Sequence, residues 1–190
     1  MFGRKTKIIS DEQLMQQICI GNQQAFTDLY ERYKDRLYYY FYRMLGNSEE
    51  LANDFLQEVF LRIIEKPEQF NPAYPFTTWI FSVAHNLCKN EYRRRDIRKQ
   101  TNTLNADLAI EDSVTETISK EKLVERIFDF IEELNQEQRS VFLLHYREGF
   151  ALKEIAQMLE IPLGTVKSRL YYTRKYLASQ FEHLKDEIEL

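Results

Sequence analysis

The sequence predicts an all-α protein in which two small helical domains are joined by a polar, acidic linker and the second domain contains a helix-turn-helix. Apolar residues recur every three or four positions through most of the chain, a spacing that gathers them on one face of a helix. The 190 residues include five glycines and four prolines, too few for the many turns of a β-sandwich or barrel. Residues 97–119 lose the helical periodicity and are polar and acidic, which is typical of a linker.

The domain before the linker, residues 1–96, is expected to contain four helices. Gly21 and Gly46 are natural helix stops, and Pro67 follows the end of the third helix. Asn47 and Thr77 are candidate N-caps for the helices that they precede. The four predicted helices are Asp11–Gly21, Ala25–Leu45, Asn47–Lys66 and Thr77–Arg95, the last reaching this residue or slightly beyond. A loop with several aromatic residues separates the third helix from the fourth.

The domain after the linker, residues 120–190, is expected to contain four more helices. They are Lys120–Leu134, Gln136–Arg147, Ala151–Glu160 and Gly164–Phe181. The turn at residues 161–164 joins the last two into a helix-turn-helix. The apolar stripe of the first of these two helices comprises Leu152, Ile155, Ala156 and Leu159. The inward positions of the second are Val166, Leu170, Thr173 and Leu177.

The outward face of the last helix carries bases and hydrogen-bonding side chains, and we call it the reading face. It comprises Lys167, Ser168, Tyr171, Tyr172, Arg174 and Lys175. Arg and Lys can bind guanine edges or phosphates in the major groove, Ser can bond to either, and Tyr can contact thymine methyl groups. Lys153, on the preceding helix, could hold a phosphate. A structural helical hairpin with a basic, solvated face is the alternative interpretation.

Charge is distributed unevenly although the net charge is −4. Residues 89–99 carry six bases and two acids, residues 165–177 carry four bases and no acid, and residues 107–137 carry ten acids and three bases. Two basic regions separated by an acidic one suit a nucleic-acid-binding protein better than the net charge suggests. Solvated helix faces remain the plainer explanation for any single charged run.

Several classes of protein are disfavoured. No apolar run approaches the length of a membrane span and no signal peptide is evident, so we expect a cytoplasmic protein without membrane insertion of its own. Cys19 and Cys88 lack metal or redox spacing, which fits a reducing compartment. The histidines show no metal-ligand spacing, and no catalytic constellation or phosphate-binding loop is evident. We therefore expect neither an enzyme nor a cofactor.

Longer strings of sequence add a family resemblance. Residues 134–144 (LNQEQRSVFLL) and 164–170 (GTVKSRL) resemble the fourth domain of bacterial RNA polymerase sigma factors, which reads the minus-thirty-five promoter element. Residues 54–60 (DFLQEVF) resemble the core-binding segment of sigma domain two. Residues 76–87 (FTTWIFSVAHNL) and the following RRR at 93–95 resemble its minus-ten-binding helix. The resemblance covers residues 12–96 and 120–180 and leaves no room for further sigma domains, which indicates the extracytoplasmic-function subfamily.

This resemblance implies a surface for docking to the polymerase on the third helix, which we call the docking face. It comprises Asp54, Gln57, Glu58 and Leu61. The implied partner is the pair of clamp helices in the polymerase's largest subunit, and the implied partner of the second domain is the flap of the second-largest subunit. The spacing alone is more typical of a solvated helix face. An anti-sigma factor is a further expected partner.

The resemblance also implies a surface for the minus-ten element, which we call the minus-ten surface. It comprises Phe70, Asn71, Tyr74, Trp79, Val83, Asn86, Lys89, Asn90, Arg93 and Arg94. Phe70 and Asn86 are the first candidates for a pocket that takes an unstacked base, with Asn71 and Tyr74 next. Trp79 is as well suited to a core support as to a base contact. Arg93, Arg94 and Arg95 would bind phosphates.

For the minus-thirty-five element the resemblance implies the reading face together with Lys153, Thr165 and Arg169. The implied function is to bind core RNA polymerase, direct it to promoter DNA and help melt the minus-ten region. Glu160 departs from the family pattern, because a glycine often ends the first helix of the motif there. Tyr172, Ser82 and His85 stand where basic residues are frequent. Two alternatives remain: a stand-alone DNA-binding regulator, and a helical adaptor that does not bind DNA.

Overall fold

The computed structural model describes residues 9–101, 127 and 129–188, and these residues form helices without a β-strand. The chain divides into two compact units, Met1–Cys88 and Lys89–Leu190. The all-α prediction is thus confirmed. The predicted linker from residue 102 onward and most of the predicted helix Lys120–Leu134 lie outside the described residues. Among the residues that are described, no helix has the length and apolar character needed to span a membrane.

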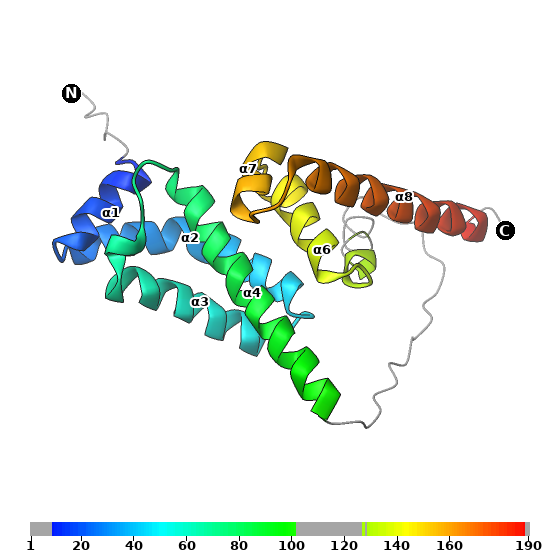
Figure 1. Cartoon of the computed structure of the whole chain (residues 1–190), viewed down its shortest axis with the longest axis horizontal. Helices are drawn as coiled ribbons and strands as arrows, with labels where there is room; N and C mark the ends of the chain where they lie inside the picture. Colours follow the sequence, from blue (N-terminus) through cyan, green and yellow to red (C-terminus); the bar gives the residue numbers. More distant parts are fainter. Residues whose placement is uncertain (1–8, 102–126, 128, 189–190) are drawn as a thin grey trace. The chain divides into compact units, whose positions relative to one another are not determined.

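Four helices start in the first unit, and the last of them continues past the boundary at Cys88 (Figure 1). They are α1 (Asp11–Cys19), α2 (Gln23–Met44), α3 (Glu49–Glu65) and α4 (Phe76–Thr101), with a short 3₁₀ helix, η1 (Pro67–Gln69), after α3. α4 continues past its predicted end, so the first five residues of the predicted linker are helical. No glycine or proline interrupts residues 76–101, which allows this length. Within the predicted part, Arg95 pairs with Glu91 one turn earlier at 3.0 Å.

Helix ends in the first unit follow local side-chain chemistry. Ser10 caps α1 in a capping box with Gln13, and Asn22 caps α2 by accepting from two backbone N–H groups. The prediction that Asn47 caps the third helix was wrong. Ser48 does so, accepting from the N–H of Leu51 at 3.3 Å, because Asn47 adopts a left-handed backbone with φ of 56° that finishes the preceding turn.

The interior of the first unit is rich in aromatic residues. Its largest fully buried side chains are Tyr40, Phe41, Phe76, Phe81, Leu14, Met15, Leu29, Leu37, Met44, Ile63 and Ile80. These rings meet edge to face, as between Tyr40 and Phe81 at 5.7 Å and between Phe41 and Phe55 at 5.7 Å. Cys88 is buried and Cys19 is exposed.

The second unit contains the helix-turn-helix. Its labelled elements are α6 (Gln136–Phe142), the π-helical turn η2 (Leu143–Arg147), α7 (Leu152–Met158) and α8 (Leu163–Ile188). The predicted helix over residues 136–147 is therefore an α-helix that changes to a π-helix in its second half. α8 starts one residue before Gly164 and runs beyond its predicted end at residue 181.

Candidate nucleic-acid interface

The docking face lies on α3 and is largely open to solvent. Asp54 and Gln57 are exposed, and 52% of the Leu61 surface is exposed. Glu58 is half-buried, and its carboxylate forms an ion pair with Arg62 one turn later, with an N–O distance of 2.6 Å. Part of the negative charge expected on this face is therefore balanced within the helix itself.

An aromatic cluster underlies the loop between α3 and α4. The Phe70 ring lies 5.5 Å from both Phe76 and Trp79, and Phe76 lies 5.6 Å from Trp79. Phe70 is 7% exposed, so it forms the base of this loop rather than an open stacking platform. Asn71 and Tyr74 are exposed above it, and Tyr74 shows 59% of its surface.

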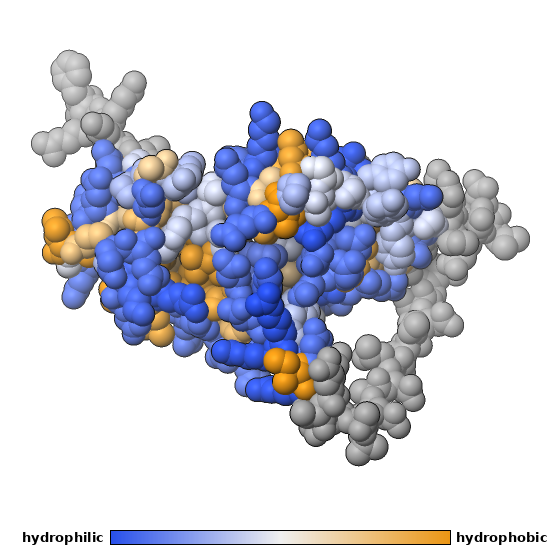
Figure 2. Space-filling model, in the orientation of Figure 1, coloured by the Kyte–Doolittle hydropathy of each residue, from blue (hydrophilic) through white to orange (hydrophobic). Residues whose placement is uncertain are grey.

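The exposed part of α4 becomes polar and then basic toward its C-terminal end. Trp79 and Val83 are half-buried near the start of the helix. The exposed members of the minus-ten surface farther along are Asn86, Lys89, Asn90, Arg93 and Arg94. In Figure 2 the corresponding part of α4 is covered mainly by hydrophilic residues. Arg95 is half-buried and pairs with Glu91, which leaves Arg93 and Arg94 as the open bases of the triplet.

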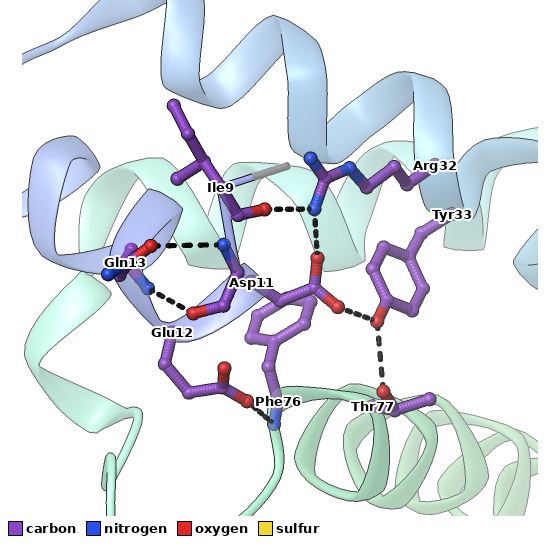
Figure 3. Close-up of polar contacts among 9 residues, drawn as sticks. Ile9, Asp11, Glu12, Gln13, Arg32, Tyr33, Phe76 and Thr77 are labelled. Carbon is purple, nitrogen blue, oxygen red and sulfur yellow. Dashed lines mark hydrogen bonds and ion pairs between the residues drawn. The ribbon is translucent and has the colours of Figure 1, made fainter. Parts of the chain in front are cut away.

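The prediction that Thr77 caps α4 was wrong, because α4 begins at Phe76 and Thr77 lies inside its first turn. The Thr77 hydroxyl instead lies 3.0 Å from the hydroxyl of Tyr33 on α2 (Figure 3). Tyr33 in turn donates a hydrogen bond to Asp11 on α1, whose other carboxylate oxygen accepts from Arg32 at 2.7 Å. Burial, reinforced by the hydrogen bond to Asp11, raises the pKa of the Tyr33 phenol, which therefore stays protonated.

A second carboxylate of α1 binds the backbone of α4. The Oε1 atom of Glu12 accepts from the N–H of Phe76 at 3.1 Å (Figure 3). This hydrogen bond is the main cause that lowers the pKa of Glu12 below its ordinary value of 4.5, so the side chain is an anion at neutral pH. α1 therefore contacts the first turn of α4 directly through Glu12 and indirectly, by way of Tyr33, through Asp11. Neither carboxylate is among the predicted site residues.

The helix-turn-helix orients its second helix as predicted. The inward residues Val166, Leu170, Thr173 and Leu177 are all buried. Every residue of the reading face is exposed, with 62% of Tyr171 and 59% of Tyr172 open to solvent. Lys153 on α7 is exposed as well, whereas Thr165 is half-buried.

Two bases of the surface predicted for the minus-thirty-five element are engaged within the second unit. The Arg169 guanidinium forms an ion pair with Glu137 at the start of α6, and its side chain is 19% exposed. Arg174 donates from Nε to the hydroxyl of Tyr146, and its guanidinium lies 5.6 Å from the centre of that ring. Arg169 thus joins two elements, while Arg174 holds Tyr146 beside the reading face.

Two exposed apolar or aromatic side chains extend the predicted surfaces. Ile64 lies one turn beyond Leu61 on α3 and is 53% exposed, which widens the docking face. Tyr146, 47% exposed, belongs to the π-helical turn and reaches α8 through Arg174. Helical spacing from Leu61 could have identified Ile64, but the position of Tyr146 depends on a π-turn for which the sequence shows no signal.

The described residues contain no group of three or more His, Cys, Asp or Glu side chains arranged to hold a metal ion. His85 is half-buried, with Nδ1 3.4 Å from the Tyr40 hydroxyl, and His145 lies 3.0 Å through Nδ1 from the carbonyl oxygen of Phe150. Both rings have contacts typical of helix residues in a folded interior.

Comparison with known proteins covers both units. Residues 29–97 match the family model described as Sigma-70 region 2, and residues 125–177 match that described as Sigma-70, region 4. The chain is 32% identical over 183 residues to the ECF RNA polymerase sigma factor SigW of Bacillus subtilis (strain 168), covering 90% of this chain and 96% of that protein. It is 26% identical over 188 residues to the ECF RNA polymerase sigma-E factor of Haemophilus influenzae, covering 93% and 97%.

Solved structures agree at the level of the fold. CnrH, in complex with the cytosolic domain of CnrY, aligns with a TM-score of 0.67 at 24% identity and covers 91% of this chain and 97% of that one. The sigma factor RpoE of Bartonella quintana, in complex with the anti-sigma factor NepR, aligns with a TM-score of 0.67 at 18% identity and covers 84% and 98%.

Proposed function

Because this chain belongs to the ECF sigma factors of RNA polymerase, we propose that its two units divide the work of promoter recognition. The first unit binds core polymerase through the docking face and takes the minus-ten element on α4 and the preceding loop. The second unit reads the minus-thirty-five element with α8. The polymerase carries out all RNA synthesis, and the chain acts with it in the cytoplasm.

The observation that carries this proposal is the two-sided character of α8. Val166 and Thr173 are fully buried on one side of the helix. Lys167 and Tyr171, which come between them in the sequence, are exposed on the opposite side. Because packing of its buried side holds the helix in place, it can enter the major groove as a rigid body. Its exposed side chains then meet the base pairs in a defined order. Lys167 and Lys175 supply charge for phosphates or guanine edges, and the two tyrosines supply apolar contact.

The proposed minus-ten role rests on exposed side chains of α4 and of the loop before it. Phe70 is buried, so we assign it the base of the site rather than a direct stacking partner. Asn71, Tyr74 and Asn86 are exposed and are the side chains that would contact an unstacked nucleotide. Arg93 and Arg94, about two turns beyond Asn86, would bind the phosphates that follow.

The docking role rests on an acidic and aliphatic strip on α3. Asp54 and Gln57 offer acceptors, and Leu61 and Ile64 offer more than half of their surfaces for apolar contact. A basic helical partner such as the polymerase clamp matches this combination, since opposite charges steer association and apolar burial holds it. One sigma factor of similar fold, RpoE of Bartonella quintana, is bound to the anti-sigma factor NepR, so we also expect an anti-sigma factor to compete for one or more of these surfaces.

The proposal is tested by run-off transcription with purified core polymerase and a library of genomic fragments, with and without this protein. We expect new transcripts whose start sites share paired upstream elements. The double variant Lys167→Ala plus Tyr171→Ala should abolish them, because it removes charge and apolar contact from the reading face. Lys66→Ala, an exposed lysine at the end of α3 and outside all three surfaces, is the matched control and should transcribe normally.

The same preparation distinguishes the alternatives. A stand-alone regulator would bind specific DNA without polymerase and yield no new transcripts. A helical adaptor would show no salt-dependent DNA affinity in any setting, whereas each phosphate contact adds about one unit to the slope of log affinity against log salt concentration. Either result from a folded protein, together with failure to co-purify with core polymerase, would overturn the proposal.

A further inference from the structure

The start of α1 is joined to the start of α4 by two carboxylates, although more than sixty residues separate them in the sequence (Figure 3). Glu12 accepts from the backbone N–H of Phe76, and Asp11 reaches Thr77 through the hydroxyl of Tyr33. α1 ends at Cys19, ahead of residue 29, where the match to the region 2 model begins. The contacts therefore tie the body of the region 2 match to a segment that precedes it.

Glu12, on α1, caps the N-terminus of α4 although it is far from that helix in the sequence. The first N–H groups of a helix have no acceptor within the helix, and the positive end of the helix dipole favours an anion there. Phe76 is the first residue of α4, and its N–H points to the Glu12 carboxylate at 3.1 Å. The lowered pKa of Glu12 agrees with a charged acceptor in this place. A hydrogen bond to an ionised acceptor is also stronger than one between neutral groups.

The two carboxylates are themselves held firmly. Ser10 and Gln13 close a capping box around the first turn of α1, with hydrogen bonds of 3.2 and 3.3 Å. Arg32 on α2 donates to Asp11 at 2.7 Å and to the carbonyl oxygen of Ile9 at 2.9 Å. The first turn of α1 is therefore fixed against α2, and through it α4 acquires a defined starting point.

The start of α4 and the loop before it carry part of the minus-ten surface. Phe76 is fully buried, and its ring packs on Tyr33 at 5.2 Å, on Phe70 at 5.5 Å and on Trp79 at 5.6 Å. The exposed Tyr74 lies two residues before Phe76. A shift of the Phe76 backbone would move this loop and the Trp79 ring together, and small errors of placement lower the efficiency of a preorganised site strongly.

We propose that Glu12 and Asp11 are positioning residues for promoter melting, which hold the first turn of α4 and the loop before it in the geometry that captures an unstacked minus-ten base. This inference rests on the proposed function. Neither carboxylate is assigned a direct contact with DNA. Their effect is transmitted through Phe76 and Thr77.

The test uses holoenzyme assembled from core polymerase and the full chain, on a promoter recovered in the run-off experiment and carrying a fluorescent base in the minus-ten region. We expect Glu12→Ala to lower open-complex formation about tenfold, the size expected for loss of a hydrogen bond to a charged group. Affinity for core polymerase should stay within about twofold of wild type, as for a surface substitution. Glu12→Gln keeps an acceptor oxygen and should recover most of the activity.

Glu31→Ala is the matched control, because it removes an exposed carboxylate that pairs with Lys34 at 2.7 Å on the outer side of α2. It should open the promoter like wild type. If Glu12→Ala does not fold, Tyr33→Phe takes its place. This variant keeps the buried ring and removes the hydroxyl that joins Asp11 to Thr77, and we expect a loss of several-fold, typical of one buried hydrogen bond.

The inference is overturned if Glu12→Ala opens the promoter as well as wild type does, or if its affinity for core polymerase falls by the same factor, because either result leaves Glu12 a general structural role. Wild-type holoenzyme that opens no promoter would instead refute the proposed function, and the inference would fall with it. Promoter opening by the wild-type holoenzyme therefore distinguishes failure of the inference from failure of the proposed function.

Discussion

Glu160 has a backbone conformation that residues other than glycine, asparagine and aspartate rarely adopt. Its φ is 54°, in the left-handed region, directly after α7. The N–H of Ile161 donates to the carbonyl of Ala156 at 3.0 Å and that of Glu160 to the carbonyl of Gln157 at 3.3 Å, which is the Schellman pattern at a helix end. The turn of the helix-turn-helix therefore forms in spite of its residue type.

We predict that Glu160→Gly stabilises the second unit by about 0.5–1 kcal/mol. A left-handed residue with a Cβ costs roughly 1–2 kcal/mol, and the greater freedom of glycine in the unfolded chain offsets part of the gain. Urea unfolding followed by circular dichroism measures the difference. Gly149→Ala is the converse control: Gly149 has φ of 78° and open space around its Cβ position, so backbone strain alone should destabilise this variant. Equal stability of all three proteins would contradict the prediction.

Which side of α8 faces inward could be predicted from residue types, but the partners of individual side chains could not. Periodicity identified Val166, Leu170 and Thr173 as inward positions, and all are buried. It gave no indication that Arg169 would pair with Glu137, which lies 32 positions earlier in α6. Periodicity concerns one helix at a time, whereas that ion pair depends on how two helices pack.

At the scale of elements, the described helices appear in the predicted order, and the deviations are at their ends. α4 extends to Thr101 because the basic run after Arg95 contains no helix breaker. Loss of apolar periodicity predicts a linker there, but it does not by itself end a helix. The π-helical turn at residues 143–147 was missed for a different reason. It shifts the hydrogen-bond partner by one residue and leaves the apolar spacing nearly unchanged, so the sequence pattern does not report it.

Arg139 joins α6 to the segment before it. Its side chain is buried, 8% exposed, and its guanidinium donates to the carbonyl oxygens of Ile131, Glu132 and Leu134. The carbonyls at the end of a helix lack partners within the helix, and a guanidinium can satisfy several of them at once because its donors form a planar fork. Three backbone acceptors thus help to accommodate a buried arginine among apolar side chains.

We predict that Arg139→Lys destabilises the second unit by about 1–3 kcal/mol, since one ammonium cannot reproduce the fork and leaves buried carbonyls unsatisfied. Chemical unfolding of the full chain gives the value. Arg62→Lys makes the same change where the side chain is 43% exposed and pairs only within α3 among the contacts described, and it should alter stability by no more than about 0.5 kcal/mol. Equal losses in the two variants would show that the three carbonyl contacts do not stabilise the unit.

At the scale of the whole chain, each unit has an interior of its own. In the first, fully buried side chains come from α1, α2, α3 and α4. In the second, Ile131, Leu134, Phe142 and Leu177 form one cluster against which Ile127, Phe130 and Tyr176 pack. Burial and a hydrogen bond to Glu133 raise the pKa of Tyr176 to about 12, so this contact at the cluster edge persists at neutral pH.

We therefore predict that residues 1–101 and 120–190 fold as separate fragments. The first fragment keeps all of α4, and the second keeps the cluster described above. Each should unfold cooperatively in urea, because a domain with its own buried core behaves as a two-state unit. Arg139→Lys should destabilise the second fragment by the same amount as the full chain. Equal losses would show that the fragment unfolds from the native structure. A fragment that melts without a cooperative transition would show that its unit depends on the rest of the chain for stability.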